Sequence, residues 1–295
     1  MVDPSVRDEV LTLGEDGRLV AIVSHPSGDP PVAHGTTLSP GTTAPGLIIL
    51  NAGVLHRVGP HRLHVVLARR LASEGISGLR LDLGGIGDST ASPDATSFRD
   101  SAVADTRIAM TEMTRRFGVS RFVLFGICAG ADNALATALA DDRVAGIILV
   151  DPPTHPTRRS RLRSWYTRIA KRRRPQDVVR RGLNAVQRRL QSAIAQLAGR
   201  PEAPPPSGKR EAPPLPAYCD QLTRLADRGV RILAIFSGIH GAGYNHPDQL
   251  FEWFPALRGR IDHAYFAHAN HTFTELSVQA ELVDTVTRWV ANRLR

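Results

Sequence analysis

Short apolar runs alternate with segments of helical periodicity along most of the chain, and this alternation is its clearest structural signal. The run at residues 46–50, GLIIL, is apolar at successive positions, which is typical of a strand buried on both faces. Between such runs, apolar residues recur about every three to four positions, as they do on one face of a helix. Strands are expected at residues 7–13, 18–25, 46–50, 78–83, 121–126, 144–150, 231–237 and 261–267. Helices are expected at residues 60–74, 98–116, 130–140, 217–228, 248–257 and 274–293.

The order of these elements predicts the fold class. The first two strands are joined by the turn sequence Gly14-Glu15-Asp16-Gly17 and form an opening hairpin. From residue 46 onward, strands alternate with helices, which favours an α/β fold with a mostly parallel, doubly wound sheet.

One long segment interrupts the alternation. Residues 176–197 place apolar side chains on one helical face, and residues 201–216 are rich in proline, as in an extended connector. The predicted organisation is therefore a core of residues 1–151 and 217–295 with an insertion at residues 152–216. Because the insertion lies between two sheet strands, we expect it to form a helical cap over the carboxyl edge of the sheet, where open α/β sheets bind ligands.

Charge is concentrated in the same insertion. The whole chain has a formal net charge of +9, but residues 152–216 hold 16 Lys and Arg against three Asp and Glu, and the remainder is slightly acidic. No aromatic platform or nucleic-acid-binding fold accompanies the charge, so nucleic acid is not the expected partner. An arginine-rich cap would instead attract an acidic acyl carrier protein or the phosphates of coenzyme A, or lie peripherally on an anionic membrane.

Composition limits the class of protein further. A content of 42% hydrophobic and 22% charged residues is ordinary for a globular domain and excludes a disordered chain. Two cysteines cannot build a disulfide framework, no apolar run could span a bilayer, and the beginning of the chain has no signal-peptide pattern. A reduced, cytoplasmic location is expected.

A candidate nucleophile follows the strand at residues 121–126. The sequence Gly126-Ile127-Cys128-Ala129-Gly130 has the form of a nucleophile elbow, in which small residues permit a sharp strand-to-helix turn, with cysteine in place of the usual serine. The amino end of the next helix favours a thiolate and leaves the Ala129 N–H free to bind an oxyanion. A purely structural cysteine at a glycine-rich turn is the alternative.

A cysteine nucleophile needs a base and a second oxyanion donor. His271 lies in the loop before the last helix, where a nucleophile–acid–histidine order places the base, whereas His268 is expected to end the strand before it. The Val54 N–H, which follows Gly53 after the strand at residues 46–50, is the predicted second donor.

With these residues in view, the chain resembles the α/β-hydrolase superfamily. Residues 51–89, the elbow GICAG and the segment HANHTF carry this likeness, and the run HRVGPHR at residues 56–62 is similar to the exosortase-A-associated hydrolases, a serine-aminopeptidase-like branch. The resemblance implies an α/β-hydrolase fold and acyl hydrolysis or transfer, without a named substrate.

The catalytic acid departs from the superfamily pattern. The acid usually follows the strand that is here residues 231–237, but the chain continues with Ser237-Gly238 and has no carboxylate there. Asp151, at the end of the preceding strand, is the favoured acid, because its task is to orient His271. Asp248, or a dyad of Cys128 and His271 without an acid, remain alternatives.

The run at residues 56–62 also carries cations. Arg57 and Arg62 are candidates for an anion site at the mouth of the substrate pocket. His56, His61 and His64 lack a cysteine or carboxylate nearby in sequence that would complete a ligand set, so no metal is expected. Since neither a P-loop nor a dinucleotide fingerprint is present, no cofactor is expected.

The thiol of Cys128 narrows the range of reactions that the sequence predicts. Cys128 would form an acyl thioester, and thioester exchange is nearly energy-neutral, which suits an acyl-thioester hydrolase or acyltransferase. An ester or peptide hydrolase of the same fold is one alternative. A catalytically degenerate protein that binds a partner or docks on a membrane is another.

Overall fold

The computed structural model describes residues 4–27, 44–92, 97–170, 213–238 and 244–294, with the side chains of residues 167–170 excepted. At its centre lies an eight-stranded sheet in the order β1-β2-β4-β3-β5-β6-β7-β8. The strands are β1 (Val6–Leu13), β2 (Leu19–Pro26), β3 (Gly46–Ile49), β4 (Gly78–Leu81), β5 (Phe122–Ile127), β6 (Val144–Val150), β7 (Arg231–Ser237) and β8 (Asp262–Phe266). β1 pairs with β2 and β2 with β4 in antiparallel fashion, and all other neighbours are parallel. The predicted, mostly parallel α/β sheet is therefore confirmed.

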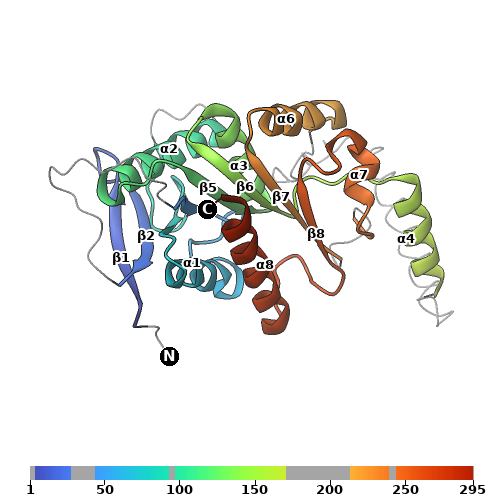
Figure 1. The fold of residues 1–295 in the computed structure, drawn as a ribbon, viewed down its shortest axis with the longest axis horizontal. Coiled ribbons are helices and arrows are strands. Elements are labelled where there is room, and N and C mark those ends of the chain that lie inside the picture. Colours follow the sequence, from blue (N-terminus) through green and yellow to red (C-terminus); the bar gives the residue numbers. More distant parts are fainter. Residues whose placement is uncertain (1–3, 28–43, 93–96, 171–212, 239–243, 295) are drawn as a thin grey trace, which may run out of the picture.

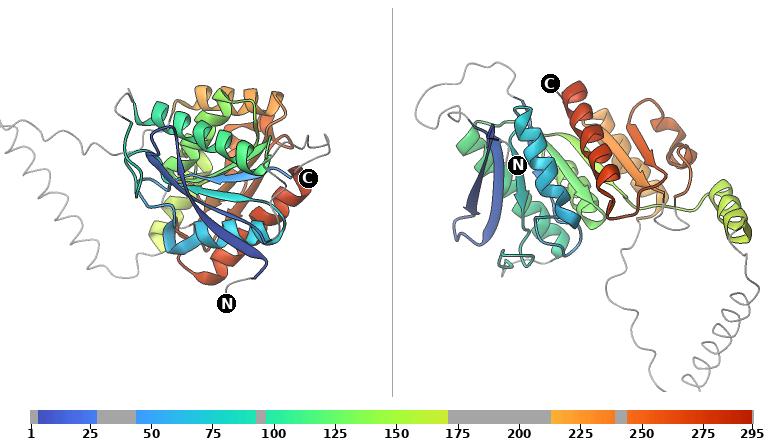
Figure 2. Two further views of the ribbon diagram at one scale, coloured as in Figure 1. Left: turned by 90° about the vertical axis from the view of Figure 1, so that its left-hand side faces the viewer. Right: turned by 90° about the horizontal axis from the view of Figure 1, so that it is seen from below.

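Helices cover both faces of the sheet (Figures 1 and 2). The described helices are α1 (Leu63–Ser73), α2 (Phe98–Phe117), α3 (Ala129–Ala140), α4 (Arg158–Ala170), α6 (Leu215–Asp227), α7 (Gln249–Trp253) and α8 (Leu276–Leu294), with 3₁₀ turns η1 (Pro60–Arg62) and η2 (Pro255–Leu257). α1 and α8 pack together on one face, and α2, α3 and α6 lie on the other. Alternate side chains of β3 enter the two resulting cores: Ile48 joins the core beneath α2 and α3, whereas Leu47 and Ile49 join the one beneath α1. Burial on both faces explains why the strand is apolar at every position.

The parallel strands bring the candidate residues to one edge. β5, β6, β7 and β8 all point the same way, so their carboxyl ends lie side by side. Cys128 follows β5, Asp151 follows β6, Ser237 ends β7, and the loop holding His271 follows β8. The sheet alone therefore gathers residues that are up to 143 positions apart in sequence, as between Cys128 and His271.

The first turn of α1 differs from the prediction. A regular helix was expected from Pro60, but η1 holds His61 and Arg62 in left-handed backbone with φ values of 49° and 62°. The preceding Gly59 has φ 72°, and a Cβ there would lie 2.4 Å from the ring of buried His64. The close approach of this ring forces the chain into a turn before α1 can begin.

Only part of the insertion is described. The helix expected at residues 176–197 and most of the proline-rich stretch lie outside the described residues, so the cap and its boundaries stay predictions. α4, which the sequence did not predict, lies at the β8 end of the molecule, beyond α7 (Figure 1). None of the described helices combines the length and apolar character needed to cross a bilayer.

Candidate active site

Cys128 occupies a strained turn between β5 and α3. Its backbone has φ 57° and ψ −118°, a region that non-glycine residues rarely adopt and that costs about 1–3 kcal/mol. The Cys128 N–H donates to Val150 O at 2.9 Å, which fixes the turn to the neighbouring strand β6. The side chain is half-buried at the amino end of α3. This sharp strand-to-helix turn is the backbone shape expected of the elbow, and the role of Cys128 as nucleophile stays a prediction.

Two glycines permit this turn because backbone atoms crowd them. A Cβ on Gly126 would lie 2.1 Å from the carbonyl carbon and oxygen of Gly130, far inside van der Waals contact. A Cβ on Gly130 would lie 2.6 Å from Asn51 O, in the loop after β3. The glycines therefore allow β5, α3 and the β3 loop to meet around Cys128.

His271 and Asp151 form a hydrogen-bonded pair beside the elbow. His271 Nδ1 and Asp151 Oδ2 lie 2.7 Å apart, and the imidazole also hydrogen-bonds Cys128. Since Asp151 accepts from Nδ1, Nε2 is the ring nitrogen left for the thiol. The Asp151 side chain is 2% exposed and that of His271 28% exposed, so the ring lies between a buried charge and solvent. Cys128, His271 and Asp151 thus form one continuous network.

Asp151 is held rigidly at the end of β6. Its backbone is left-handed, with φ 47°, and its N–H donates to Ile235 O at 2.8 Å. The Ser237 N–H donates to Oδ1 at 2.7 Å, and Ser237 Oγ donates to Oδ2 at 2.6 Å. With His271, three donors compensate the buried carboxylate. Ser237, which sequence reasoning did not select, stands where the superfamily usually has its acid and instead hydrogen-bonds the acid on the next strand.

The two alternatives to Asp151 are placed differently. Asp248 precedes α7 with its side chain 53% exposed, 3.9 Å from Arg258, whereas the carboxylate that His271 hydrogen-bonds is that of Asp151. A dyad without an acid does not describe a His271 ring that is hydrogen-bonded to Asp151.

The hydrogen bond to Asp151, followed by the one to Cys128, raises the pKa of His271 from 6.5 to about 9, against the opposing effect of burial. Because the folded-state pKa is raised, these interactions stabilise the fold fully below pH 6.5, and the stabilisation is lost as the pH rises through about 9. We expect an NMR titration of the His271 ring to give a midpoint near 9, and Asp151→Asn to move it down toward 6.5. A wild-type midpoint near 6.5, or no shift in the variant, would contradict the pairing.

Removing the Ser237 hydroxyl should weaken the site without dismantling it. Ser237→Ala keeps the backbone donor to Oδ1 but loses the one to Oδ2, so we expect about a tenfold loss of activity, equivalent to about 1.4 kcal/mol. Ser24→Ala is the matched control, since buried Ser24 Oγ donates to Asp8 Oδ1 at 2.5 Å far from the elbow. Both variants should lose stability in urea unfolding, but only Ser237→Ala should lose turnover. Equal turnover in the two variants would show that the Ser237 hydroxyl does not position Asp151.

The predicted oxyanion donors lie on segments that approach each other. Ala129 is the first residue of α3, so its N–H has no acceptor within the helix. Val54 follows Gly53, which has φ 62°, and its side chain is 86% exposed. Buried Asn51 fixes the loop, because its Oδ1 accepts from the Leu83 N–H at 2.8 Å and its Nδ2 donates to Leu55 O at 2.8 Å. Binding of an oxyanion by Val54 and Ala129 remains a prediction.

Arg57 is not available to a ligand in the way the sequence suggested. Its guanidinium is buried, pairs with Asp82, and lies 2.7 Å from Asp88. Its own N–H donates to Asp82 Oδ1 at 2.6 Å. Two carboxylates already pair with its guanidinium, so an anion would have to compete with them, and the anion-binding role of Arg57 stays a prediction.

The pairing of Arg57 with Asp82 and Asp88 also bears on the prediction that no metal binds near His56. The fold brings Asp82 and Asp88 to His56, with ligand atoms within 4.8 Å of one another, a cluster that sequence spacing did not reveal. The Arg57 guanidinium lies on both carboxylates and supplies the positive charge that a cation would bring. In this arrangement the two carboxylates are hydrogen-bonded to Arg57, and the absence of a metal stays a prediction.

Different surroundings hold the other basic residues of this region, which are His61, Arg62 and nearby His64. His61 Nε2 lies 3.3 Å from Thr274 Oγ1, so the run contacts the loop that holds His271. Arg62 is exposed beside it, and its anion-binding role stays a prediction. His64 is fully buried with its ring edge-to-face on Phe125, and burial lowers its pKa to about 3, so it is a neutral core side chain.

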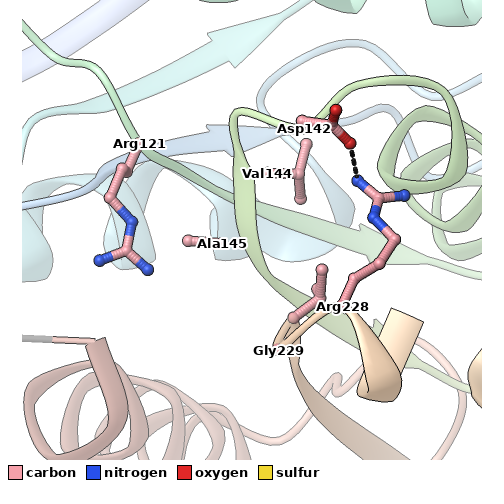
Figure 3. Close-up of a pocket in the computed structure, with 7 residues that line it drawn as sticks. Arg121, Asp142, Val144, Ala145, Arg228 and Gly229 are labelled. Carbon is pink, nitrogen blue, oxygen red and sulfur yellow. Dashed lines mark hydrogen bonds and ion pairs between the residues drawn. The ribbon is translucent and has the colours of Figure 1, made fainter. Parts of the chain in front are cut away.

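A cavity of about 340 Å³ opens at the opposite edge of the sheet (Figure 3). Its lining comes from the beginnings of β5, β6 and β7, including Arg121, Val144 and Val230, and from Arg228, which is paired with Asp142. This is the amino edge of the parallel strands, whereas ligands of such sheets bind at the carboxyl edge. The cavity does not belong to the network around Cys128.

Comparison with known proteins places this geometry in a known fold. A family model described as the alpha/beta hydrolase fold matches residues 45–180. Among solved structures, an esterase from Pyrococcus furiosus aligns with a TM-score of 0.59 and 12% identity over 98% of this chain and 92% of that chain. A thermophilic esterase from Thermogutta terrifontis gives 0.53 and 15% over 98% and 100%. A serine hydrolase without a lid from Xanthomonas campestris gives 0.52 and 16% over 99% and 96%. No curated protein matches the chain.

Proposed function

From the α/β-hydrolase fold that this chain adopts, we propose that it is an acyl-thioester hydrolase or acyltransferase working through a covalent acyl-Cys128 intermediate. One observation supports this above the others. The strained Cys128 at the amino end of α3 hydrogen-bonds His271, whose other ring nitrogen is paired with buried Asp151. This arrangement has the nucleophile, base and orienting acid that acyl transfer requires.

The acylation half-reaction begins from a thiolate–imidazolium pair, because a His271 ring with a pKa of about 9 already holds at neutral pH the proton that Nε2 takes from Cys128 Sγ. The thiolate attacks the acyl carbon, and the Val54 and Ala129 N–H groups bind the oxyanion. Collapse of the tetrahedral intermediate breaks the bond to the carrier sulfur, which leaves with the proton from His271. Asp151 keeps the ring oriented and stabilises the imidazolium.

The second half-reaction releases the acyl group. Neutral His271 removes a proton from water or an acceptor nucleophile, which attacks the thioester carbonyl. The Cys128 sulfur leaves and regains its proton from His271. Water gives a free acid, whereas an amine or thiol acceptor gives a transferred acyl group.

The chemistry of cysteine favours a thioester as the substrate. Exchange between two thioesters is nearly energy-neutral, so Cys128 does not need to activate a poor leaving group. An acyl carrier protein or coenzyme A would bring such a thioester, with acidic or phosphate groups that suit the arginine-rich insertion. The narrower resemblance to exosortase-A-associated hydrolases and a cytoplasmic location are part of this proposal.

Intact-mass spectrometry tests the proposal directly. Mixing the protein with acyl-coenzyme A thioesters of several chain lengths should add one acyl mass to the wild type and none to Cys128→Ala. Cys219→Ala is the matched control, because Cys219 is half-buried on α6 and lies outside the network. No adduct and no thioester consumption across the panel would favour a non-catalytic binding protein.

Ester hydrolysis is the second candidate, and two structures of esterases among those with a similar fold favour it. Cys128→Ser separates the two. An ester hydrolase should keep substantial activity with the serine, whereas the thioester mechanism should lose most of its turnover. Hydrolysis of a p-nitrophenyl ester by Cys128→Ser at the wild-type rate would favour the ester reading.

A further inference from the structure

α4 presents an apolar face to solvent. Leu162, Trp165 and Tyr166 are 53%, 55% and 59% exposed, and the rings of Trp165 and Tyr166 contact each other edge-to-face at 5.2 Å. Large apolar side chains gathered on one exposed helix commonly mark an interaction site. Neither the network around Cys128 nor the core uses these three side chains.

The opposite face of α4 attaches it to the body. Ser160 is fully buried, and Asn245 Nδ2 donates to Ser160 O at 2.8 Å and to Ser164 Oγ at 3.0 Å. At about 100° per residue, Leu162, Trp165 and Tyr166 point away from the side that holds Ser160 and Ser164. The helix is therefore anchored along one side, with its apolar stripe directed outward from the molecule.

Arginines flank this stripe. Exposed Arg158, Arg159, Arg161 and Arg163 all lie on α4, and the sequence has no acidic residue between Asp151 and Asp177. Arg159 Nη1 lies 3.8 Å from Glu252, a contact too long and exposed to neutralise the surface. The α4 surface thus combines an apolar centre with a strongly positive border.

We propose that α4 docks this protein onto an anionic lipid bilayer, lying in the interface with Leu162, Trp165 and Tyr166 toward the acyl chains. Tryptophan and tyrosine favour the headgroup boundary, and arginines beside an apolar stripe keep their charges among anionic headgroups. The helix has 13 residues, which suits lying along a membrane and not crossing it. The proposal does not depend on the chemistry assigned to Cys128.

Flotation with lipid vesicles tests the docking. The full chain should bind vesicles of phosphatidylcholine with about 30% phosphatidylglycerol and not vesicles of phosphatidylcholine alone, and high salt should release much of it. Leu162→Ser with Trp165→Ser should weaken partitioning at least tenfold, as should Arg158→Gln with Arg161→Gln. Phe98→Ser is the matched control, because Phe98 is 50% exposed at the beginning of α2, away from α4.

Each contrary result overturns the proposal. Equal binding to both kinds of vesicle would show that charge does not drive the docking. Full binding by both α4 variants would show that another basic segment, and not α4, contacts the membrane. Binding of an acyl carrier protein through Leu162 and Trp165, without vesicle binding, would make the α4 surface a protein-docking site. Thermal unfolding of each variant near the wild-type temperature shows that lost binding is not lost folding.

Discussion

Replacing His271 with alanine is expected to slow acylation of Cys128 by about 10²- to 10⁴-fold, the usual contribution of a positioned acid–base catalyst. The imidazole is the group that both removes the thiol proton and returns one to the leaving sulfur. Rapid quenching followed by intact-mass spectrometry measures the rate of acyl-Cys128 formation. The fold should survive, because the Asp151 carboxylate keeps two hydrogen bonds from Ser237.

His268→Ala is the control in the same loop. Its side chain is exposed three residues before His271, and the network around Cys128 does not include it. The control should form the adduct at the wild-type rate. Acylation of His271→Ala within tenfold of the wild type would mean that another base serves Cys128.

Replacing Gly126 with alanine should destabilise the protein by about 3 kcal/mol or more. The new Cβ would lie 2.1 Å from the Gly130 carbonyl carbon and oxygen, and backbone atoms cannot turn aside as the end of a flexible side chain can. To relieve the clash, α3 must move away from β5, which displaces the Ala129 N–H and the turn at Cys128. We expect a lower urea midpoint and loss of adduct formation together.

Gly146→Ala provides the matched comparison on the neighbouring strand. Its Cβ would meet Leu294 Cδ1 at 3.0 Å, and this side chain can shift. The control should lose little stability and keep its activity. Gly126→Ala with a wild-type midpoint and full acylation would show that the elbow does not need a glycine there.

The sequence predicted best those strands whose burial on both faces restricts them to mostly apolar residues. β6 and β7 were expected at residues 144–150 and 231–237 and lie at those residues. Both are covered on two faces, so β6 is apolar from end to end and β7 is apolar between Arg231 and Ser237. The elbow was recognisable for a related reason, since only glycine tolerates the close backbone approach at positions 126 and 130.

What the sequence could not supply depends on contacts between distant segments. The choice between Asp151 and Asp248 rests on which strand ends adjoin the loop of His271, and on the Ser237 hydrogen bonds that only the β6–β7 register reveals. The sequence suggested that Arg57 was free to bind an anion, because its partners Asp82 and Asp88 lie 25 and 31 residues away along the chain. The sequence did not predict α4, because its residues Leu162, Trp165 and Tyr166 face solvent and do not form a buried stripe.

The adjacency of Asp151 and Ser237 has a consequence for how such proteins diverge. The two strand ends are hydrogen-bonded neighbours and Asp151 reaches the His271 imidazole, so we expect that a carboxylate at position 237 would reach it as well. An ancestor with acids at both positions would tolerate the loss of either one, which gives a neutral route for relocating a catalytic charge. Surveys that judge competence by an acid after the seventh strand would discard such lineages, whereas measuring the carboxylate–imidazole distance would retain them.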